Sequence, residues 1–290
     1  MSIKDDVREF LTTRRAKVTP QQAGLPAFGD KRRVPGLRRE EVALLAGVSA
    51  DYYIRLERGN LAGVSEQVLD ALARALWLDD AERSHLYDLA RACTGRVPGS
   101  RRAAVSKVRP GVLRILESLS GPAYVRNARG DILAANDTAY ALYDGIIERD
   151  RLPLNLPRFL FLDNRAPAFF LDWNTVAEDS VATLRIQAGH NPHDKNLTDL
   201  VGELATKSEE FRIRWARHNV KHHRTAPKRI HNALVGDIQL TGEAMELAAD
   251  GLTIITYTAE PDSPAAESLH FLASWAAHHA EAPTERTDVT

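Results

Sequence analysis

The residues of this chain best suited to specific chemistry lie on one short predicted helix, at residues 50–58. Asp51 and Arg55 are four positions apart, so both project from the same face of that helix. A guanidinium matches the O6 and N7 acceptors of guanine, a carboxylate accepts from cytosine N4, and the small side chain of Ala50 can contact a thymine methyl. We therefore expect Ala50, Asp51 and Arg55, with Tyr52, to contact base edges. A pair of opposite charges at this spacing can instead form a plain surface ion pair, and that alternative stays open.

Two helices joined by a tight turn are needed to present these side chains. Residues 38–46 are predicted to form the first helix, which ends at Gly47 because glycine adopts a left-handed cap without steric cost. Ser49 is placed to cap the second helix, which ends at Gly59. The spacing predicts that the following side chains face inward: Val42, Ala43, Ala46, Tyr53 and Leu56. A pair of this kind is typical of a helix-turn-helix whose second helix enters the major groove.

Several longer motifs resemble those of a known family. The stretches RRVPGLRREEVALLAGVS and DYYIRLERG resemble the MmyB-like subgroup of actinobacterial regulators, within the Cro/cI (XRE) type of helix-turn-helix proteins. The downstream half is similar to the same subgroup through VRNARGDILAAN, LFLDNRAP, SVATLRIQAG, SEEFRIRWARHNV and VGDIQLTGEAMEL. The resemblance covers about residues 5–260. It implies a DNA-binding transcription regulator with a PAS-like domain that binds a small, fatty-acyl-like molecule.

Contacts to the phosphate backbone are expected from three places. Arg39 begins the first helix of the pair, where its position matches a phosphate-contacting polar residue of Cro/cI-type proteins. Ser49 lies at a helix N-terminus, which favours anions. The proline- and glycine-rich stretch at residues 19–36 carries three further basic side chains, which either follow the DNA backbone or belong to a plain surface loop: Lys31, Arg32 and Arg33.

The charge distribution and the composition of the chain agree with the prediction of a DNA-binding protein. Residues 1–110 hold 20 Lys and Arg against 14 Asp and Glu, a balance of +6, whereas the remaining residues hold 18 against 25, a balance of −7. A basic half followed by an acidic half suits a module for a polyanion joined to one that does not bind nucleic acid. A single cysteine, a charged N-terminus and the lack of a long apolar run lead us to expect a cytoplasmic protein without a membrane span.

The pattern of the chain predicts two domains of different class. Residues 1–94 are expected to form an all-α, five-helix bundle of the Cro/cI kind, and residues 95–110 have the composition of a linker. Residues 111–260 begin with a helix and a two-stranded hairpin, continue through helices, and end with three strands. That order predicts an α+β domain with an antiparallel, PAS-like sheet. Residues 261–290 are expected to form a last helix and a flexible tail.

Six aromatic side chains of the second domain are candidates for lining a ligand pocket. Aromatic residues at helical spacing also form ordinary cores, so a dimerisation or protein-interaction module without a ligand remains the alternative. A single recognition helix reads few base pairs, so we expect a homodimer on two half-sites, with its interface in the second domain or the last helix. The candidates are Phe159, Phe161, Phe169, Phe170, Trp173 and Trp215.

Catalysis, metal binding and cofactors are not expected. The sequence has no G-x-S-x-G, G-x-x-x-x-G-K-[ST], H-E-x-x-H or G-x-G-x-x-G motif. His218 and His222 have helical metal spacing, with His223 beside them, but the neighbouring Lys221 and Arg224 oppose a cation. We therefore predict a basic surface segment there rather than a metal site.

Overall fold

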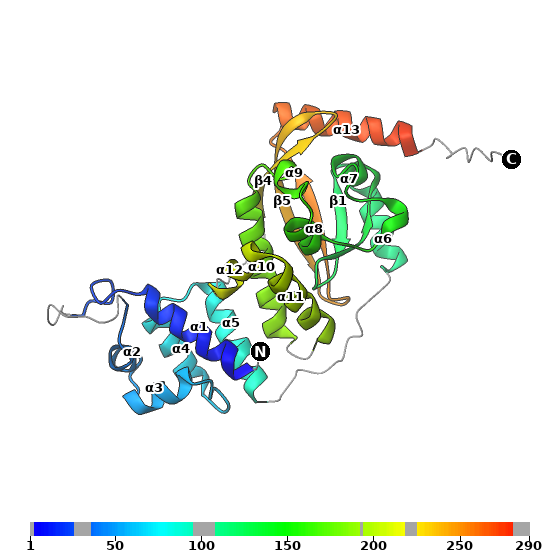
Figure 1. Cartoon of the computed structure of the whole chain (residues 1–290). Coiled ribbons are helices and arrows are strands. Elements are labelled where there is room, and N and C mark those ends of the chain that lie inside the picture. The colour runs from blue at the N-terminus through cyan, green and yellow to red at the C-terminus, as the bar shows by residue number, and fades with distance from the viewer. Residues whose placement is uncertain (1–2, 26–35, 95–107, 192–193, 218–224, 281–290) are drawn as a thin grey trace. The chain divides into compact units, whose positions relative to one another are not determined.

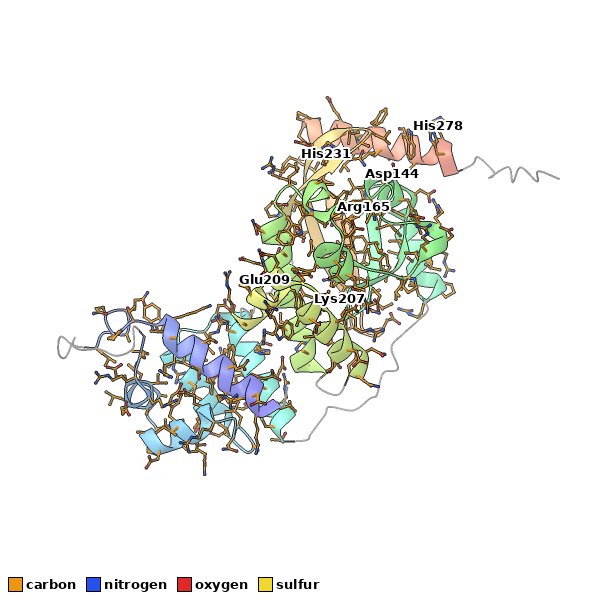
Figure 2. All side chains as sticks on the ribbon, in the orientation of Figure 1. Asp144, Arg165, Lys207, Glu209, His231 and His278 are labelled. Carbon is orange, nitrogen blue, oxygen red and sulfur yellow. The ribbon has the colours of Figure 1, made fainter. Side chains whose placement is uncertain are left out.

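The computed structural model describes residues 3–25, 36–94, 108–191, 194–217 and 225–280. Its backbone contacts divide the chain into two compact units, which are treated separately below (Figure 1, with side chains in Figure 2). The first unit comprises Met1–Ser100, Val181–Ala205 and Glu209–His222. The second comprises Arg101–Ser180, Thr206–Ser208 and His223–Thr290.

The N-terminal part of the first unit is the predicted five-helix bundle. Three of its helices begin at an N-cap residue whose side chain accepts a backbone N–H, and Ser49 is one of these, as the sequence predicts. Ser65 accepts the backbone N–H of Val68, and Asp79 forms a reciprocal capping box with Glu82. The helices are α1 (Ile3–Lys17), α2 (Arg39–Ala46), α3 (Ala50–Glu57), α4 (Glu66–Ala75) and α5 (Asp80–Cys93); the unit also contains parts or all of α10 (Trp173–His190), α11 (Lys195–Lys207) and α12 (Glu209–Ala216).

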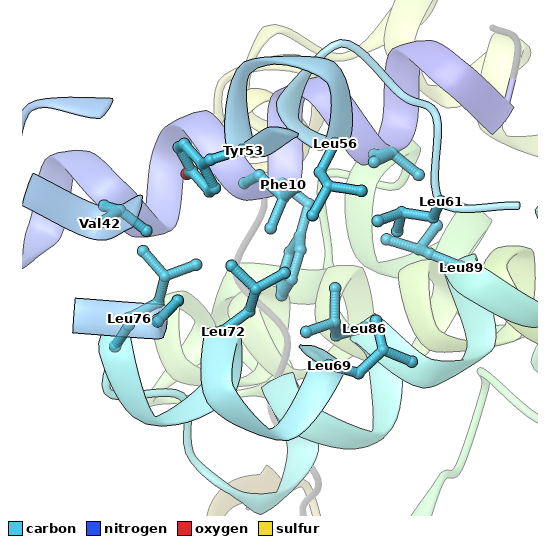
Figure 3. Packing of buried hydrophobic residues seen from close by; sticks show 14 of the residues in the cluster. Phe10, Val42, Tyr53, Leu56, Leu61, Leu69, Leu72, Leu76, Leu86 and Leu89 are labelled. Atoms are coloured by element: carbon cyan, nitrogen blue, oxygen red, sulfur yellow. The ribbon is translucent and has the colours of Figure 1, made fainter. Parts of the chain in front are cut away.

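A compact hydrophobic core holds the five helices together (Figure 3). Phe10 of α1, Leu56 of α3, Leu72 of α4 and Leu86 of α5 are all fully buried in one cluster. The predicted inward positions of the two central helices are confirmed, because each is at most 8% exposed. These positions are Val42, Ala43, Ala46, Tyr53 and Leu56. Packing of this kind fixes the angle between α2 and α3, on which the exposed residues of α3 depend.

The ends of α2 and α3 are set by two glycines. Gly47 has a φ of 66° and its N–H caps the end of α2, as the sequence predicts. Gly59 has a φ of 97°, and a Cβ at this position would lie 2.6 Å from the backbone oxygen of Lys4. Only glycine therefore satisfies both the backbone conformation and the close approach of α1 at this point.

The second unit is an α+β domain built on one antiparallel sheet, which confirms the predicted fold class. Neighbouring strands run antiparallel in the order β3-β2-β1-β6-β5-β4. Its elements are α6 (Pro110–Ser118), β1 (Ala123–Arg126), β2 (Asp131–Ala135), α7 (Asp137–Leu142), the 3-10 helix η1 (Arg149–Arg151), β3 (Leu154–Asn155), α8 (Leu156–Leu162), α9 (Ala166–Phe169), the N-terminal part of α10, β4 (Thr225–Asn232), β5 (Gly236–Leu247), β6 (Leu252–Thr258) and α13 (Pro264–Ala280).

The sheet has one strand more than the sequence pattern predicts. Strand β3 is two residues long and pairs Asp131 with Asn155 and Ile132 with Leu154. Two residues are too few to show the alternation that marks a strand, and Pro157, two positions after β3, suggests a loop or a helix start. The other five strands, in two separate groups along the chain, follow the prediction.

The two faces of the sheet are covered by different helices (Figure 1). Val112 and Leu116 of α6 pack with Ala123 and Val125 of β1 on one face. Helices α7, α8, α9 and α13, with the start of α10, share a second cluster with Tyr124 on the opposite face. The alternation of side chains along β1 therefore divides the core of this unit in two. Among the described helices, none combines the length and apolar character that a membrane span requires.

Candidate nucleic-acid interface and buried aromatic core

The start of α3 presents a compact set of exposed polar groups. Ser49 is its N-cap, and the hydroxyl oxygen accepts the backbone N–H of Tyr52 at 3.2 Å. Asp51 and Arg55 are exposed on the helix surface, while Ala50 and Tyr52 are half-buried beside them. All five belong to the first turns of one helix. The structure thus brings the predicted base-reading residues to a single outward surface.

Arg55 lies over an aromatic ring rather than against the nearby carboxylate. Its guanidinium carbon is 4.9 Å from the centroid of the Tyr52 ring, within the range of a cation–π contact. Within the described parts of the chain, no ion pair joins Arg55 to Asp51. The alternative of a plain surface ion pair between them is therefore not the arrangement in this structure. The five N–H donors of Arg55 stay available at the surface.

A buried carboxylate at the end of α3 connects three helices, and sequence reasoning missed it. Glu57 is 2% exposed and accepts from Arg15 of α1 at 3.0 and 3.1 Å. It also accepts from Arg39 of α2 at 3.1 and 3.3 Å and from the Thr12 hydroxyl at 3.1 Å. The position of Glu57, one turn after the inward-facing Tyr53, is the one signal in the sequence for its burial.

The electrostatics of this group follow from its two arginine partners. Burial raises the pKa of Glu57, but hydrogen bonds and charge from Arg15 and Arg39 outweigh it and hold the pKa below its ordinary value. For Arg15, burial lowers the pKa, yet contact with Glu57 leaves that pKa above its ordinary value. Glu57 and Arg15 are therefore charged at neutral pH, and the hydrogen bonds that Glu57 accepts from Arg15 and Arg39 fix α3 against α1 and α2.

The contact with Glu57 orients the side chain of Arg39 but does not bury it. Its side chain is 51% exposed at the start of α2, so one edge of the guanidinium meets Glu57 and the rest faces solvent. This arrangement leaves donors for a phosphate while limiting the freedom of the side chain. Of the other predicted backbone contacts, Ser49 lies at the start of α3, whereas Lys31, Arg32 and Arg33 lie outside the described residues.

In the second unit, five of the six predicted pocket aromatics gather in one cluster. Phe159, Phe169 and Phe170 are at most 8% exposed, and their ring centroids lie 4.8 to 6.4 Å apart. Phe161 and Trp173 pack against this cluster and lie edge to face with each other, with their ring centroids 6.0 Å apart. Trp215 is not among them, because it belongs to the first unit, where its ring stacks on Phe211 at 5.5 Å.

Three buried tyrosines adjoin these aromatics and were not predicted from the sequence. The hydroxyls of Tyr143 and Tyr257 are 2.7 Å apart, and the ring of Tyr124 lies 5.9 Å from that of Tyr143 and 6.4 Å from that of Tyr257. Burial raises the pKa of each hydroxyl, so all three are neutral and able to donate. The signal for Tyr124 and Tyr257 in the sequence is their place at inward positions of apolar strands.

An open pocket of about 870 Å³ lies beside α8 in the same unit. Its apolar wall includes Ile146, Leu154 and Phe159, and Phe159 also contacts the buried aromatic cluster. Its polar rim includes Arg165, labelled in Figure 2, which forms a two-pronged ion pair with Asp163 at 2.7 and 3.0 Å. The volume falls in the range of small-molecule sites, and one wall of the pocket is shared with the core.

The described residues hold no group of three or more His, Cys, Asp or Glu side chains placed to bind a metal ion. The three histidines for which we considered metal binding, His218, His222 and His223, lie outside the part of the chain that the structure describes. Cys93 is half-buried, and burial raises the pKa of its thiol, so the reactive thiolate is disfavoured.

Comparison with protein-family models gives two matches that together cover both units. Residues 8–86 match a helix-turn-helix domain, and this segment runs from within α1 to within α5. Residues 108–272 match the ligand-binding domain of MmyB-like transcription regulators, which begins just before α6 and ends within α13. No curated protein is matched by the sequence. With more than half of its length inside the second of these models, the chain belongs to the MmyB-like family of helix-turn-helix transcription regulators.

Proposed function

We propose that this DNA-binding regulator recognises a specific duplex sequence through α3 and senses a small apolar, fatty-acyl-like ligand through its second unit. The observation that supports DNA reading best is the exposed set at the start of α3, carried on a helix fixed by the buried Glu57. Exposed Asp51 and Arg55 can reach base edges, because the first turns of a recognition helix enter the major groove. The proposed activity is binding rather than catalysis, in the cytoplasm.

The roles divide between bases and backbone. Arg55 is proposed to donate two hydrogen bonds to guanine, Asp51 to accept from cytosine, and Ala50 and Tyr52 to contact neighbouring bases. Backbone phosphates are proposed to contact Arg39 at the start of α2, Ser49 at the start of α3, and the basic residues Lys31, Arg32 and Arg33. Because one helix of this length covers few base pairs, two copies of the chain are proposed to occupy half-sites one helical turn apart.

Selection of bound duplexes from a random library tests this proposal directly. The full-length protein is expected to enrich a short, two-fold symmetric sequence at low ionic strength, and binding is expected to weaken as salt rises. Enrichment of no sequence, or retention of all duplexes alike, would contradict sequence-specific recognition. Enrichment of a single half-site would contradict the homodimer.

Ser49→Ala tests whether the N-terminus of α3 contacts DNA. Loss of the cap is expected to lower stability by about 1 kcal/mol, because the N–H of Tyr52 loses its acceptor. Ser65→Ala is the matched control, since Ser65 caps α4 in the same bundle through Val68. Hydrogen exchange is expected to show a similar loss of stability in both variants. Anisotropy titrations with the selected duplex are expected to show an additional loss of affinity only for Ser49→Ala. Equal losses of affinity would place the Ser49 hydroxyl away from the phosphate.

The ligand part of the proposal is supported by the pocket beside α8 and by the aromatic cluster that adjoins it. Phe159 contributes to both, so an apolar chain entering the pocket meets the core directly. Native mass spectrometry of the purified protein is expected to show a bound species of lipid-like mass that is released on unfolding. A clean dimer that also takes up no added fatty acid would favour the alternative, a domain that only mediates dimerisation or protein contacts.

A further inference from the structure

Helix α10 contributes side chains to the hydrophobic cores of both units. In its first half, Val176 and Ala177 are buried in the cluster of the second unit that contains the aromatic residues. In its second half, Ile186 is buried in the cluster that holds the five-helix bundle together. The 18 residues from Trp173 to His190 contain no proline, so one uninterrupted helix joins the two cores. A change at one end of α10 can therefore reach the other end through the helix itself.

The end of α10 packs closely against α5 of the bundle. A Cβ at Gly189 would lie 2.9 Å from Cε1 of the His85 ring. That ring has little room to move, because His85 is 4% exposed and lies edge to face with Phe10 of α1, with their ring centroids 5.1 Å apart. Burial lowers the pKa of His85 to about 3, so the ring is neutral at physiological pH. A side chain at position 189 would therefore push α10 away from α5 or displace a packed ring.

Two polar side chains of α10 support the same contact. Nε2 of His190 lies 2.6 Å from a carboxylate oxygen of Asp88, and Arg91 contacts the other oxygen. Burial raises the pKa of Asp88, but the contacts with His190 and Arg91 outweigh it and hold that pKa below its ordinary value. Burial also lowers the pKa of Arg185 to about 10, while the carboxylate of Asp6 on α1 acts against that fall. Arg185 therefore stays charged at neutral pH, within electrostatic range of α1.

The contact between the end of α10 and α5 has the character of one that can open. Its polar groups can be solvated when they separate, and Asp88 keeps Arg91 as a partner after His190 has left. Contacts rich in polar groups between parts of one chain open more readily than an apolar core does. A docked and a released end of α10 are thus two states of the protein. Whatever favours one of these states, in either unit, shifts the balance between them.

We propose that the docking of α10 on α5 couples the second unit to DNA binding, and that the docked state is the one that binds duplex. The inference rests on the proposed reading of duplex by α3. Docking adds Ile186 to the core of the bundle and so stabilises the fold that presents α3, whereas release removes this support. A change in the second unit that reaches the start of α10 thus alters the affinity for DNA. By linkage, binding of DNA stabilises the docked helix by the same factor.

The experiment uses this linkage and needs no ligand of the second unit. Hydrogen exchange of residues 176–180, which belong to the second unit, is measured in the full-length protein with and without the duplex selected from the random library. The duplex is expected to slow their exchange about fivefold or more, the low end of typical coupling between sites.

Gly189→Ala is expected to reduce this slowing to less than about twofold, because the added Cβ meets the His85 ring and weakens docking. Gly202→Ala is the matched control. It makes the same substitution on α11 of the first unit, where a Cβ would have open space, and it should keep the full effect.

His190→Ala guards against misfolding of Gly189→Ala, because it removes only the exposed partner of Asp88. It is expected to weaken the effect of the duplex on residues 176–180 while the bundle stays folded. His231→Ala is its control, since His231 lies 2.7 Å from Asp237 in the second unit, away from α5, and this variant should keep the full effect.

The outcomes separate a failure of coupling from a failure of DNA reading. Binding of the selected duplex with unchanged or faster exchange at residues 176–180 would overturn the coupling and leave DNA reading in place. Binding of no duplex would overturn both. An undiminished effect in both Gly189→Ala and His190→Ala would overturn the role of the contact between α10 and α5. An equal loss in Gly202→Ala would overturn it as well.

Discussion

Glu57→Gln is expected to lower the free energy of unfolding of the helix-turn-helix by about 3 kcal/mol, because the change breaks a buried ion pair on one side only. Arg15 and Arg39 both donate to this carboxylate, and Arg15 is only 11% exposed, so its charge would be left without compensation. Protection of the α1 and α3 amides against hydrogen exchange in the intact protein measures this loss locally. Glu40→Gln, an exposed change on the same helix as Arg39, is the control and should alter stability by less than about 0.5 kcal/mol.

The same carboxylate makes a specific prediction about pH. The pKa of Glu57 is lower in the folded protein than the ordinary value of 4.5, so the folded state resists protonation more than the unfolded state does. Its contribution is therefore complete above pH 4.5 and is lost as the pH falls through the lower, folded value. Protection of α3 should fall on acidification in the unsubstituted protein and less steeply in Glu57→Gln. Parallel curves for the two proteins would contradict the assigned role of Glu57.

Arg55→Ala is expected to relax the sequence preference of the protein at one base pair by roughly 1–3 kcal/mol, because a bidentate contact to guanine is lost. The structure supports a contact between Arg55 and a base because Arg55 is exposed and lies over the Tyr52 ring. Among the described residues it has no ion pair with Asp51. The measurement is a set of titrations with the selected duplex and with each of its single base-pair variants.

Two control variants sharpen the test of Arg55. Arg55→Lys keeps the charge but loses the two-pronged geometry, so it should retain overall affinity and lose discrimination. Arg58→Ala removes an exposed arginine just beyond the end of α3, and it should leave the preference at every base pair unchanged. An identical preference profile for Arg55→Ala and the unsubstituted protein would show that α3 does not read bases through this residue.

Local signals made the DNA-binding half predictable from the sequence. Gly47 and Ser49 fix the turn through rules that involve only a few neighbouring residues, and the observed φ of 66° and the hydrogen bond to Tyr52 follow them. The inward faces of α2 and α3 follow from helical periodicity in the same way. What local rules could not supply is the partner of Glu57, because Arg15 is 42 positions away in the chain.

The second unit shows the opposite case, in which long-range contacts decide the site. Tyr143 and Tyr257 are 114 positions apart, so nothing in either segment predicts that their hydroxyls meet. Trp215 has the same helical spacing and apolar character as the other candidate aromatics, yet it packs on Phe211 in the first unit. Periodicity shows that a side chain is buried, but it does not show in which core. The class of the fold was predictable because strands, helices and strands follow one another in order.

The most direct test of base reading by α3 is a titration of isotope-labelled protein with the selected duplex. The amide resonances of the first unit are the quantity measured. The largest changes are expected at the start of α2, near Arg39, and from Ser49 to Arg55, with far smaller changes in α4. A duplex that binds tightly while these amides keep their resonances unchanged would contradict it.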